Sequence, residues 1–569
     1  MSIRKIYETL SAPIGKNPLF YLALISLFSI SIISIEIEKS SRICSLFEMF
    51  GDVYFLCALM LAIPLKARRY AKITVFFVLW IIGIADMMCY QTMGVALCPN
   101  ILQTWMQTNF SEASEVLGVH LNAYVFLTPV SLIVFLPLIF FFIRKEKFRL
   151  PRAAMCVLLL LTFSSAVYGI GNKRYLCNLL TRTSEEDTEY LFEEQTMTRD
   201  YLPAYRLITS VSEIRRFSNM RQHLAATLEN TAIEGCSHDS PLIVLIVGES
   251  YNRHHASLYG YDKPTTPLQE KLFAEGNMYK FTDVISSYNL TYKSFQNMFT
   301  FYDYDSKGMW YDFPNVLSML RKGGYEVGFF SNQNTIRKAS AFTDYCEDVF
   351  INDSQLSRYM FDKRNAETHN YDLQLLSDYR QLCSSTEKPR LLIFHFIGMH
   401  AAYKQRYPDN ETVFSPKDYN RPDLDDDQRQ TLADYDNAIV YNDKVIAAII
   451  DEFKDYNAII IHVPDHGELV YDECNELGRK LRLDPRHIKP QFDIPFWIYC
   501  TEKYKATHEE KIRQIEKSVN NPFMTDDLPH LLVDIAGIKC KEYNPQRNLI
   551  DPSFNPQRKR KICGEMEYR

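Results

Sequence analysis

The sequence has no excess of positive charge, few glycines and no closely spaced cysteine pairs. Its 569 residues carry 63 Lys and Arg against 69 Asp and Glu, a net charge of −6, so nothing indicates the basic domain typical of nucleic-acid-binding proteins. With 20 glycines and 47% hydrophobic residues, the composition excludes collagen-like and disordered chains. The 13 cysteines include no Cys-x-x-Cys zinc pair, and sequence alone does not give their pairing. What remains is a folded chain long enough for two or three domains.

Long apolar runs are confined to the first 175 residues. A helix needs about 20 apolar residues to cross a bilayer. Five runs approach that length, and the second is the shortest: Pro18–Ile35, Gly51–Leu65, Ile73–Met88, Asn122–Ile143 and Ala153–Gly171. We therefore expect a five-helix transmembrane domain over residues 1–175. Asp86 is costly in an apolar span; it either faces the bundle interior or, as we prefer, lies near the outer boundary.

The placement of Lys and Arg predicts the orientation of these spans. Basic residues precede the first run, separate the second from the third and separate the fourth from the fifth, whereas Cys89–Leu121 contains none. This alternation favours five spans, a cytoplasmic N-terminus and an outside location for everything after the fifth. No cleavage-site pattern follows the first run, so we interpret it as an uncleaved anchor.

The rest of the chain has the pattern of an α/β domain. Residues 176–235 are acidic and then helical in pattern, and we interpret them as a juxtamembrane connector. Over residues 236–569, short apolar strands alternate with amphipathic segments, which predicts a mostly parallel sheet. A helix is expected over Asp426–Lys454, and the polar, basic tail after Ile550 is expected to be a solvated end. The expected strands are Leu242–Val247, Val327–Ser331, Leu391–Phe396, Ala458–Val463 and Ile494–Cys500.

Two of these strands end in acidic or histidine residues. Leu242–Val247 leads into Gly-Glu249-Ser, and Ala458–Val463 leads into Pro-Asp465-His466-Gly-Glu. Because ligands gather at the carboxyl ends of parallel strands, these side chains could meet. Two carboxylates and an imidazole suit a divalent metal, with zinc or manganese favoured over magnesium. The alternative is that both segments are ordinary surface turns.

At these motifs the chain resembles the membrane-anchored phosphoethanolamine transferases of Gram-negative bacteria, in the alkaline phosphatase–sulfatase superfamily. The matching segments are LIVLIVGESYNRHHASLYGYDKPTTP, FTDVISSYNLTYKSFQNMFTF, GFFSNQN, FHFIGMHAAYKQRYP, DYDNAIVYNDKVIAAIIDEFK and PDHGE. The resemblance is closest to the branch that modifies the lipopolysaccharide core (the CptA type). It implies a periplasmic α/β/α domain with the superfamily's fold, anchored in the bacterial inner membrane.

The resemblance also implies roles for single residues. Glu249, Thr291, Asp465 and His466 match the family's zinc site, with Thr291 as its nucleophile. One Zn²⁺ is implied, and a second is left open. Other matching positions are two histidines near the phosphate and three substrate-binding residues: His400, His487, Thr108, Glu112 and Asn332. Gln333 and Arg337 follow Asn332 in the same segment, and Arg337 would supply positive charge.

The sequence differs from the lipid A branch of the family and from sulfatases at positions near Thr291, which argues against both assignments. The lipid A branch brackets its nucleophile with two cysteines, and Ser287 and Asn297 stand at those positions here. The Cys/Ser-x-Pro-x-Arg signature of a sulfatase nucleophile is absent at Thr291.

Four further histidines are expected to be structural. We expect His254 and His255 to pack against helices or face solvent, and an active-site role is the minor alternative. His395 and His462, inside strands, are predicted to be core histidines.

The resemblance implies a two-step transfer. Thr291 would take phosphoethanolamine from phosphatidylethanolamine, and a hydroxyl of lipopolysaccharide, on an inner-core sugar or on lipid A, would then take it from Thr291. The alternatives are a phosphoglycerol transferase of the lipoteichoic-acid type and a catalytically inactive membrane protein that binds lipopolysaccharide.

Overall fold

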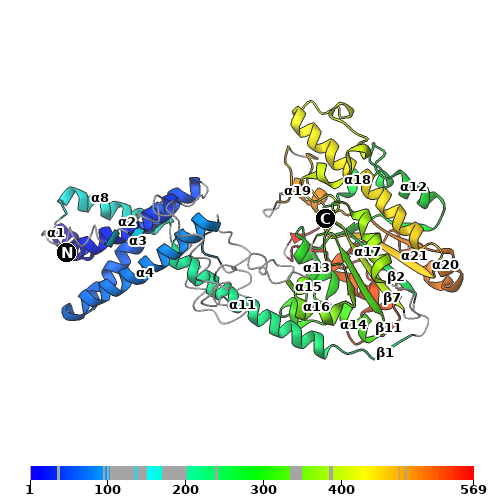
Figure 1. Cartoon of the computed structure of the whole chain (residues 1–569), viewed down its shortest axis with the longest axis horizontal. Helices are drawn as coiled ribbons and strands as arrows, with labels where there is room; N and C mark the ends of the chain where they lie inside the picture. The colour runs from blue at the N-terminus through cyan, green and yellow to red at the C-terminus, as the bar shows by residue number, and fades with distance from the viewer. Residues whose placement is uncertain are drawn as a thin grey trace. The chain divides into compact units, whose positions relative to one another are not determined.

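The computed structural model describes residues 2–34, 39–93, 96–98, 102, 133–134, 136–137, 150–168, 202–237, 241–333, 349–383, 389–472, 475–480, 484–564 and 566–568. They form two compact units, one on each side of the step from Asn219 to Met220 (Figure 1). The first unit is helical: α1 (Ile3–Gly15), α2 (Pro18–Ser34), α3 (Lys39–Ala62), α4 (Leu65–Met93), α8 (Arg152–Tyr168) and the start of α11 (Pro203–Asn230).

Two helices of this unit are long and apolar enough to cross a membrane, at Ser45–Ala62 in α3 and Leu65–Tyr90 in α4. Helices α1 and α2 make a third candidate if they form one span bent by 63°, and α8 is shorter. Five spans are therefore not confirmed among the described residues, and the expected run Asn122–Ile143 lies almost entirely outside them. The shortest expected run, Gly51–Leu65, overlaps a full-length span because the apolar segment begins earlier, at Ser45.

The helices of the first unit bury one face and expose apolar side chains on the other. Phe55, Leu59, Phe77 and Leu160 remain exposed, as suits helices that contact lipid. Asp86, by contrast, is buried inside the unit, and its Oδ1 accepts a hydrogen bond of 2.8 Å from Nε of Arg206 in α11. Asp86 therefore faces the interior of this unit, four residues before the end of the span Leu65–Tyr90.

The second unit is built on a seven-stranded sheet. Its order is β3 (Met278–Phe281), β9 (Phe496–Cys500), β8 (Ala458–Pro464), β2 (Leu242–Gly248), β7 (Arg390–His395), β5 (Glu326–Ser331) and β6 (Lys363–Arg364). The five strands from β8 to β6 run parallel, and β9 runs antiparallel to both of its neighbours, β8 and β3, so the sheet is mixed. All five strands expected from sequence are confirmed, with ends that differ by one or two residues.

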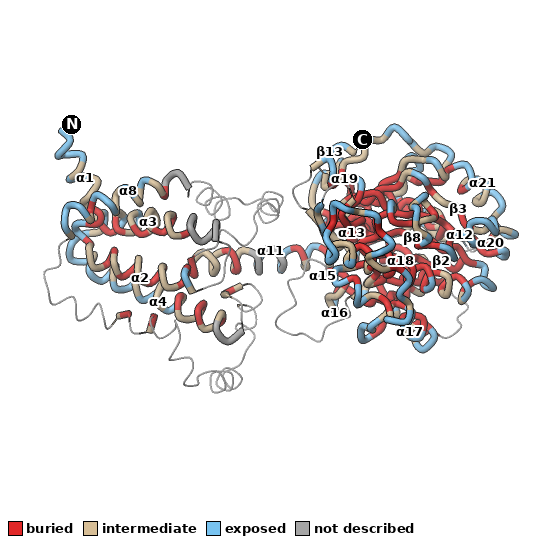
Figure 2. Tube along the Cα trace, turned by 90° about the horizontal axis from the view of Figure 1, so that it is seen from above, coloured by how far each residue is buried: buried red, intermediate tan, exposed pale blue. Residues whose placement is uncertain are grey.

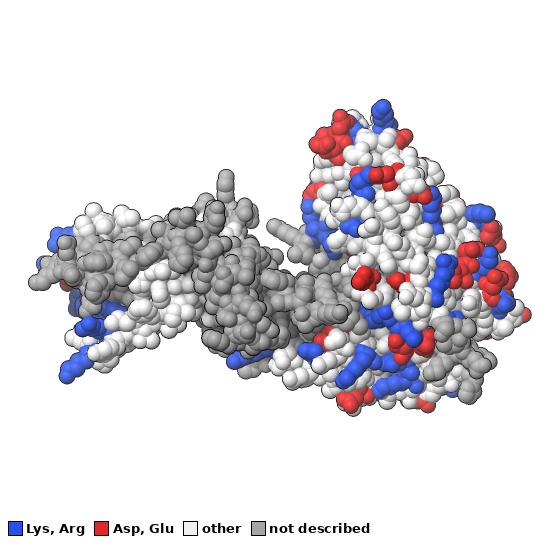
Figure 3. Space-filling view, viewed as in Figure 1, with Lys and Arg blue, Asp and Glu red and all other residues white. Residues whose placement is uncertain are grey.

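Helices cover both faces of the sheet, which is why the central strands are continuous apolar runs. On one face α17 (Leu375–Leu382) and α18 (Asp426–Phe453) pack on Val244, Ile246 and Phe394. On the other face lies α13 (Thr291–Phe299), whose Phe295 ring is 4.8 Å from that of His395. Figure 2 shows the buried residues concentrated in this unit's interior. Acidic and basic side chains are interspersed on the face in Figure 3.

The remaining helices and strands are short. The helices are α12 (Pro267–Ala274), α14 (Val316–Lys322), α15 (Val349–Asn352), α16 (Ser354–Met360), α19 (Pro485–Phe492), α20 (Glu502–Thr507), α21 (Glu509–Ser518) and α22 (Leu528–Ile535). Three two-stranded ladders pair β1 (Gly235–Cys236) with β11 (Ile538–Lys539), β4 (Val284–Ile285) with β10 (Phe523–Met524), and β12 (Lys561–Ile562) with β13 (Met566–Glu567).

The prediction of a solvated C-terminal tail is confirmed only in part, since residues 555–557 and Lys559 are exposed and others are not. Ile562 is fully buried, and Arg558 pairs with Asp526 through an Nη2–Oδ2 contact of 2.6 Å. Arg558 and Arg560 of the tail therefore pair with acidic residues of the domain, whereas Lys559 stays exposed.

Candidate active site

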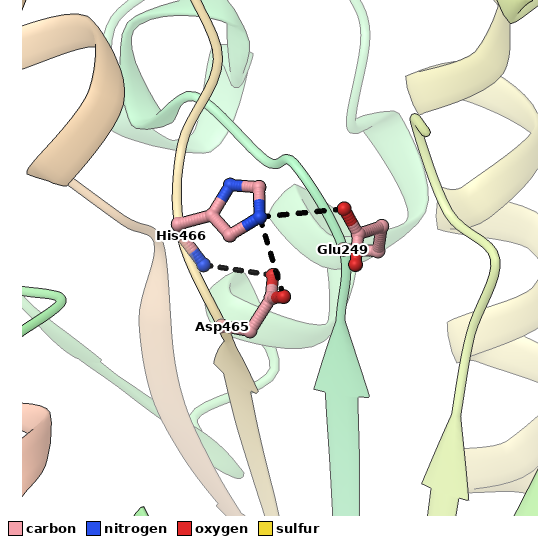
Figure 4. Close-up of side chains that lie close together, drawn as sticks. All are labelled: Glu249, Asp465 and His466. Atoms are coloured by element: carbon pink, nitrogen blue, oxygen red, sulfur yellow. Dashed lines mark hydrogen bonds and ion pairs between the residues drawn. The ribbon is translucent and has the colours of Figure 1, made fainter. Parts of the chain in front are cut away.

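The candidate metal-binding residues lie where two neighbouring parallel strands end. Gly248 of β2 pairs with Pro464 of β8, so the residues that follow, Glu249 and Asp465, leave the sheet at the same edge. Figure 4 shows their side chains converging with that of His466. The register of two buried strands thus brings together residues more than 200 positions apart in the chain.

Glu249, Asp465 and His466 are fully buried, and one ligand atom from each lies within 4.8 Å of the others. Nε2 of His466 is 3.4 Å from Oε1 of Glu249 and 3.4 Å from Oδ2 of Asp465. Such spacing leaves room for one ion between an imidazole and two carboxylates.

Protonation of the group suits a metal. Nδ1 of His466 lies 2.7 Å from the carbonyl oxygen of Gly467, which can only accept, so Nδ1 carries the proton and Nε2 presents its lone pair. Burial lowers the pKa of His466 to about 4, which keeps the ring neutral. Oδ2 of Asp465 is buried and accepts no hydrogen bond from the described residues. Two carboxylates and a neutral imidazole form a set of ligands that fits Zn²⁺.

The two carboxylates have opposite pKa shifts. Burial raises the pKa of Asp465 well above its ordinary value, and the negative charge of Glu249 raises it further. Burial also opposes ionisation of Glu249, but the neighbouring His466, His400 and Arg479 lower its pKa overall. Because one buried carboxylate is ionised at the other's expense, a bound cation would relieve the repulsion between them.

Thr291 lies against this group. It is the first residue of α13, and its Oγ1 donates a hydrogen bond of 3.0 Å to Oε2 of Glu249 and lies 3.4 Å from Nε2 of His466. The hydroxyl therefore stands beside the atoms that would hold the metal, and the N-terminus of α13 favours negative charge on it. Two more donors orient Glu249: Ser250 Oγ at 2.6 Å and Gln333 Nε2 at 2.8 Å.

Two charged residues of the site were not assigned from sequence. Nη1 of Arg479 lies 3.2 Å from Nε2 of His466, and its Nε lies 3.9 Å from Oε2 of Glu468. Burial raises the pKa of Glu468 to about 7. Glu468 stands in the quoted Pro-Asp-His-Gly-Glu segment, so its proximity could have been anticipated. Arg479 lies 13 positions after His466 in an irregular segment with no periodic signal.

Of the two histidines expected near the phosphate, His400 lies beside the turn of Glu249, whereas His487 contacts a different residue. His400 follows β7 and is half-buried. Met399 N donates to Glu249 O at 3.1 Å, which holds this loop against the turn that carries Glu249. Burial lowers the pKa of His400, and Glu249 opposes that shift. His487, on α19, has Nε2 3.3 Å from Oε1 of Glu476 and does not join the metal group of the described residues.

Of the residues expected to bind substrate, only Asn332 lies within the described part of the chain, and its side chain is already engaged by protein groups. The amide of Asn332 donates to Oδ1 of Asp372 at 2.9 Å and accepts from His369 N at 2.6 Å, so both ends are engaged. Gln333, its neighbour, is the residue whose amide reaches Glu249. Thr108, Glu112 and Arg337 lie outside the described residues.

The four further histidines have structural partners. His395 and His462 are buried in β7 and β8, as predicted, and the His462 ring stacks on Trp497 at 5.1 Å. His254 lies 2.9 Å from Asp493, and His255 is buried between Asp436 and Asp472.

Comparisons with known proteins agree with this arrangement. The family model described as Sulfatase matches residues 241–538. Phosphoethanolamine transferase EptC of Escherichia coli (strain K12) is 26% identical over 483 residues, 84% of this chain and 82% of that protein. Phosphoethanolamine transferase CptA of Salmonella typhimurium is 27% identical over 491 residues, with the same shares covered. The C-terminal periplasmic domain of EptC from Escherichia coli, in complex with Zn, superimposes with a TM-score of 0.51 at 29% identity, over 58% of this chain and 93% of that domain.

Proposed function

The chain belongs to the sulfatase family, and we propose that it transfers phosphoethanolamine from phosphatidylethanolamine to lipopolysaccharide. The observation that carries this proposal is the position of the Thr291 hydroxyl, 3.0 Å from Glu249 and 3.4 Å from His466. A hydroxyl beside a buried group of metal ligands suits covalent phosphoryl transfer. The relatives EptC and CptA, which are named as phosphoethanolamine transferases, support the choice of the transferred group.

Zinc would be held by Glu249, Asp465 and His466 together with Thr291, and when bound it supplies the Lewis acidity that favours the ionised form of a neighbouring hydroxyl. These side chains would need little movement to bind zinc, because Ser250 and Gln333 already orient the carboxylate of Glu249. The neutral Nε2 of His466 is aimed at the same point. The alternative to a single zinc ion is a site with two ions, in which His400 and His487 would be ligands of the second.

In the first step Oγ1 of Thr291 attacks the phosphorus of phosphatidylethanolamine. The bond from phosphorus to the diacylglycerol oxygen breaks, and phosphoethanolamine becomes esterified to Thr291. Thr291 loses its hydroxyl proton in this step, and the leaving oxygen of diacylglycerol gains one proton. His400 or His487 would carry it, and the lowered pKa of His400 keeps that imidazole able to accept a proton.

In the second step a hydroxyl of lipopolysaccharide attacks the same phosphorus. The bond to Oγ1 breaks, Thr291 is regenerated, and the acceptor's proton leaves through the same histidines. We propose an inner-core sugar as acceptor, with lipid A as the alternative. Thr108 and Glu112 are proposed to contact the donor's headgroup, and Asn332 is proposed to bind substrate near the phosphate.

Both proposed substrates are lipids of a membrane, so apolar helices that anchor the chain in that membrane would hold the catalytic domain near them. We propose that residues 1–175 anchor the chain in the bacterial inner membrane, that 176–235 connect, and that 236–569 form a periplasmic catalytic domain. The spans in α3 and α4 and the exposed apolar side chains of the first unit support the anchor.

The proposal is tested by mass spectrometry of lipopolysaccharide from cells that produce the wild-type chain or Thr291→Ala, with lipid A and core analysed separately. A phosphoethanolamine that depends on Thr291 is expected on the core. Thr431→Ala, which removes an exposed hydroxyl on α18, is the matched control and should leave the modification intact.

Other outcomes discriminate between the alternatives. A Thr291-dependent group on lipid A would keep the mechanism and change the acceptor. Phosphoglycerol in place of phosphoethanolamine would favour a transferase of the lipoteichoic-acid type. A normal modification in a stably produced Thr291→Ala chain would overturn the nucleophile, and no modification by the wild type would favour an inactive lipopolysaccharide-binding protein.

A further inference from the structure

The C-terminal hairpin of β12 and β13 packs beside the segment that carries Thr291. Ile562, fully buried, forms a small apolar cluster with Ile285 of β4, Phe492 of α19 and Met524 of β10. Ile285 lies six residues before Thr291. The hairpin therefore contacts the start of the connection from β4 to α13.

Polar contacts fix the same segment. Cys563 N donates a hydrogen bond of 2.9 Å to the carbonyl oxygen of Ser287, a buried residue four positions before Thr291. The amide of Ser287 donates to Oγ1 of Thr525 at 3.0 Å. Both backbone polar groups of Ser287 are thus engaged, and its carbonyl depends on the hairpin. Without this donor the buried carbonyl would be left unsatisfied, which is unfavourable.

Arg560 ties the hairpin to the other end of the segment. Its guanidinium is bidentate to Asp283, with Nη1–Oδ1 at 2.8 Å and Nη2–Oδ2 at 3.0 Å. The Arg560 side chain is 14% exposed. A partly buried bidentate pair holds its two partners in one geometry more strictly than a single contact would.

We propose that this hairpin is a positioning element for the nucleophile, and that Arg560 is its principal positioning residue. By holding Asp283 and Ser287, the hairpin sets where α13 begins and keeps Oγ1 of Thr291 within reach of Glu249. The inference rests on the proposed function for its catalytic consequence, whereas the bracing of residues 283–291 can be measured without turnover. Small displacements of a reacting group are costly, on the order of 100-fold for about 1 Å.

The test compares Arg560→Ala with Lys559→Ala in the full-length chain. Lys559 is the adjacent residue of the same tail and makes an exposed pair with Glu567 at 3.1 Å. The substrate is a fluorescent phosphatidylethanolamine in detergent micelles, and the readouts are kcat and KM for diacylglycerol release, zinc content and amide hydrogen exchange. For Arg560→Ala we expect kcat to fall on the order of 10–100-fold with KM and zinc content unchanged. Exchange should rise in the peptide covering 283–292, and Lys559→Ala should resemble the wild type.

Equal kcat and equal exchange in Arg560→Ala and Lys559→Ala would overturn the proposal. So would a loss of activity that only follows the fraction of folded protein. If Arg560→Ala does not fold, Asp283→Asn, which keeps the shape and an acceptor oxygen, should show the same pattern with a smaller amplitude. If the wild type releases no diacylglycerol, the proposed function fails, and the exchange of 283–292 alone decides whether the hairpin braces the segment.

Discussion

Nη1 of Arg479 lies 3.2 Å from Nε2 of His466, one of the three buried candidate metal ligands. Its side chain is 26% exposed and is held by Glu468, so it can reach a ligand that enters from solvent. A guanidinium with several donors suits the equatorial oxygens of a phosphoryl group.

We predict that Arg479→Ala lowers kcat/KM for diacylglycerol release on the order of 100–1,000-fold, since a donor to developing negative charge is lost. Arg479→Lys should restore part of the activity, and zinc content should stay unchanged in both variants. Arg486→Ala is the control, because Arg486 is an exposed arginine of the neighbouring segment. Wild-type activity in Arg479→Ala would remove Arg479 from the reaction.

Replacement of Asp465 tests the metal site itself. Asp465→Asn keeps an oxygen for the backbone amides of Ser250 and His466 but removes the charge and one anionic ligand. We expect zinc affinity to fall by more than the 10–100-fold typical of an outer-shell partner. The measurement is zinc content after equilibrium dialysis against a competing chelator. Asp423→Asn, at an exposed carboxylate, should bind zinc like the wild type. Full zinc occupancy in Asp465→Asn would exclude Asp465 as a ligand.

His255 is expected to make stability dependent on pH. Its Nδ1 lies 2.7 Å from Asp436 and its Nε2 lies 3.2 Å from Asp472. Burial alone would lower the pKa of His255, but the two carboxylates raise it to about 10. Since the pKa in an unfolded chain is about 6.5, the charged pair contributes fully below pH 6.5, and its contribution declines as pH rises from 6.5 to 10.

We therefore predict that His255→Gln destabilises the second unit by about 3–5 kcal/mol at pH 6, and by less at pH 9.5. The difference in unfolding temperature between wild type and His255→Gln, measured from pH 6 to 9.5, isolates this group from others that titrate. His223→Gln, at an exposed histidine, is the control. A difference that does not shrink with rising pH would contradict a charged His255.

The central strands could be predicted because their physical cause lies in the sequence. Leu242–Gly248 and Ala458–Pro464 consist mainly of isoleucine, valine and leucine and are buried along their whole length. Each ends at a turn that carries acidic or histidine residues. Once β2 and β8 pair in parallel, in the register that joins Gly248 to Pro464, Glu249 lies beside Asp465.

Features that depend on long-range packing could not be predicted. Arg479 reaches His466 through an irregular segment, and the choice between Asn332 and Gln333 depends on which amide Asp372 occupies. The ion pairs of Arg558 and Arg560 in the basic tail could not be predicted, because their partners Asp283, Asp526 and Asp527 lie elsewhere in the sequence. Similarly, Asp86 in an apolar run gives no hint of Arg206, which is 120 residues later.

That distant pair is the subject of the last prediction. Asp86 is fully buried, and Arg206, 12% exposed, donates to it through Nε at 2.8 Å and also contacts Ser31 Oγ at 3.2 Å. Removal of one partner leaves an uncompensated buried charge, so Asp86→Leu and Arg206→Met should each destabilise the first unit by on the order of 3 kcal/mol. The double variant should be more stable than either single one, because no buried charge is left unpaired. The measurement is a double-mutant cycle on thiol labelling of Cys89, which is buried in α4 and reacts only when the unit opens. Additive effects of the two substitutions would mean that the ion pair contributes no coupling energy, and that α11 is held to this unit by its other contacts.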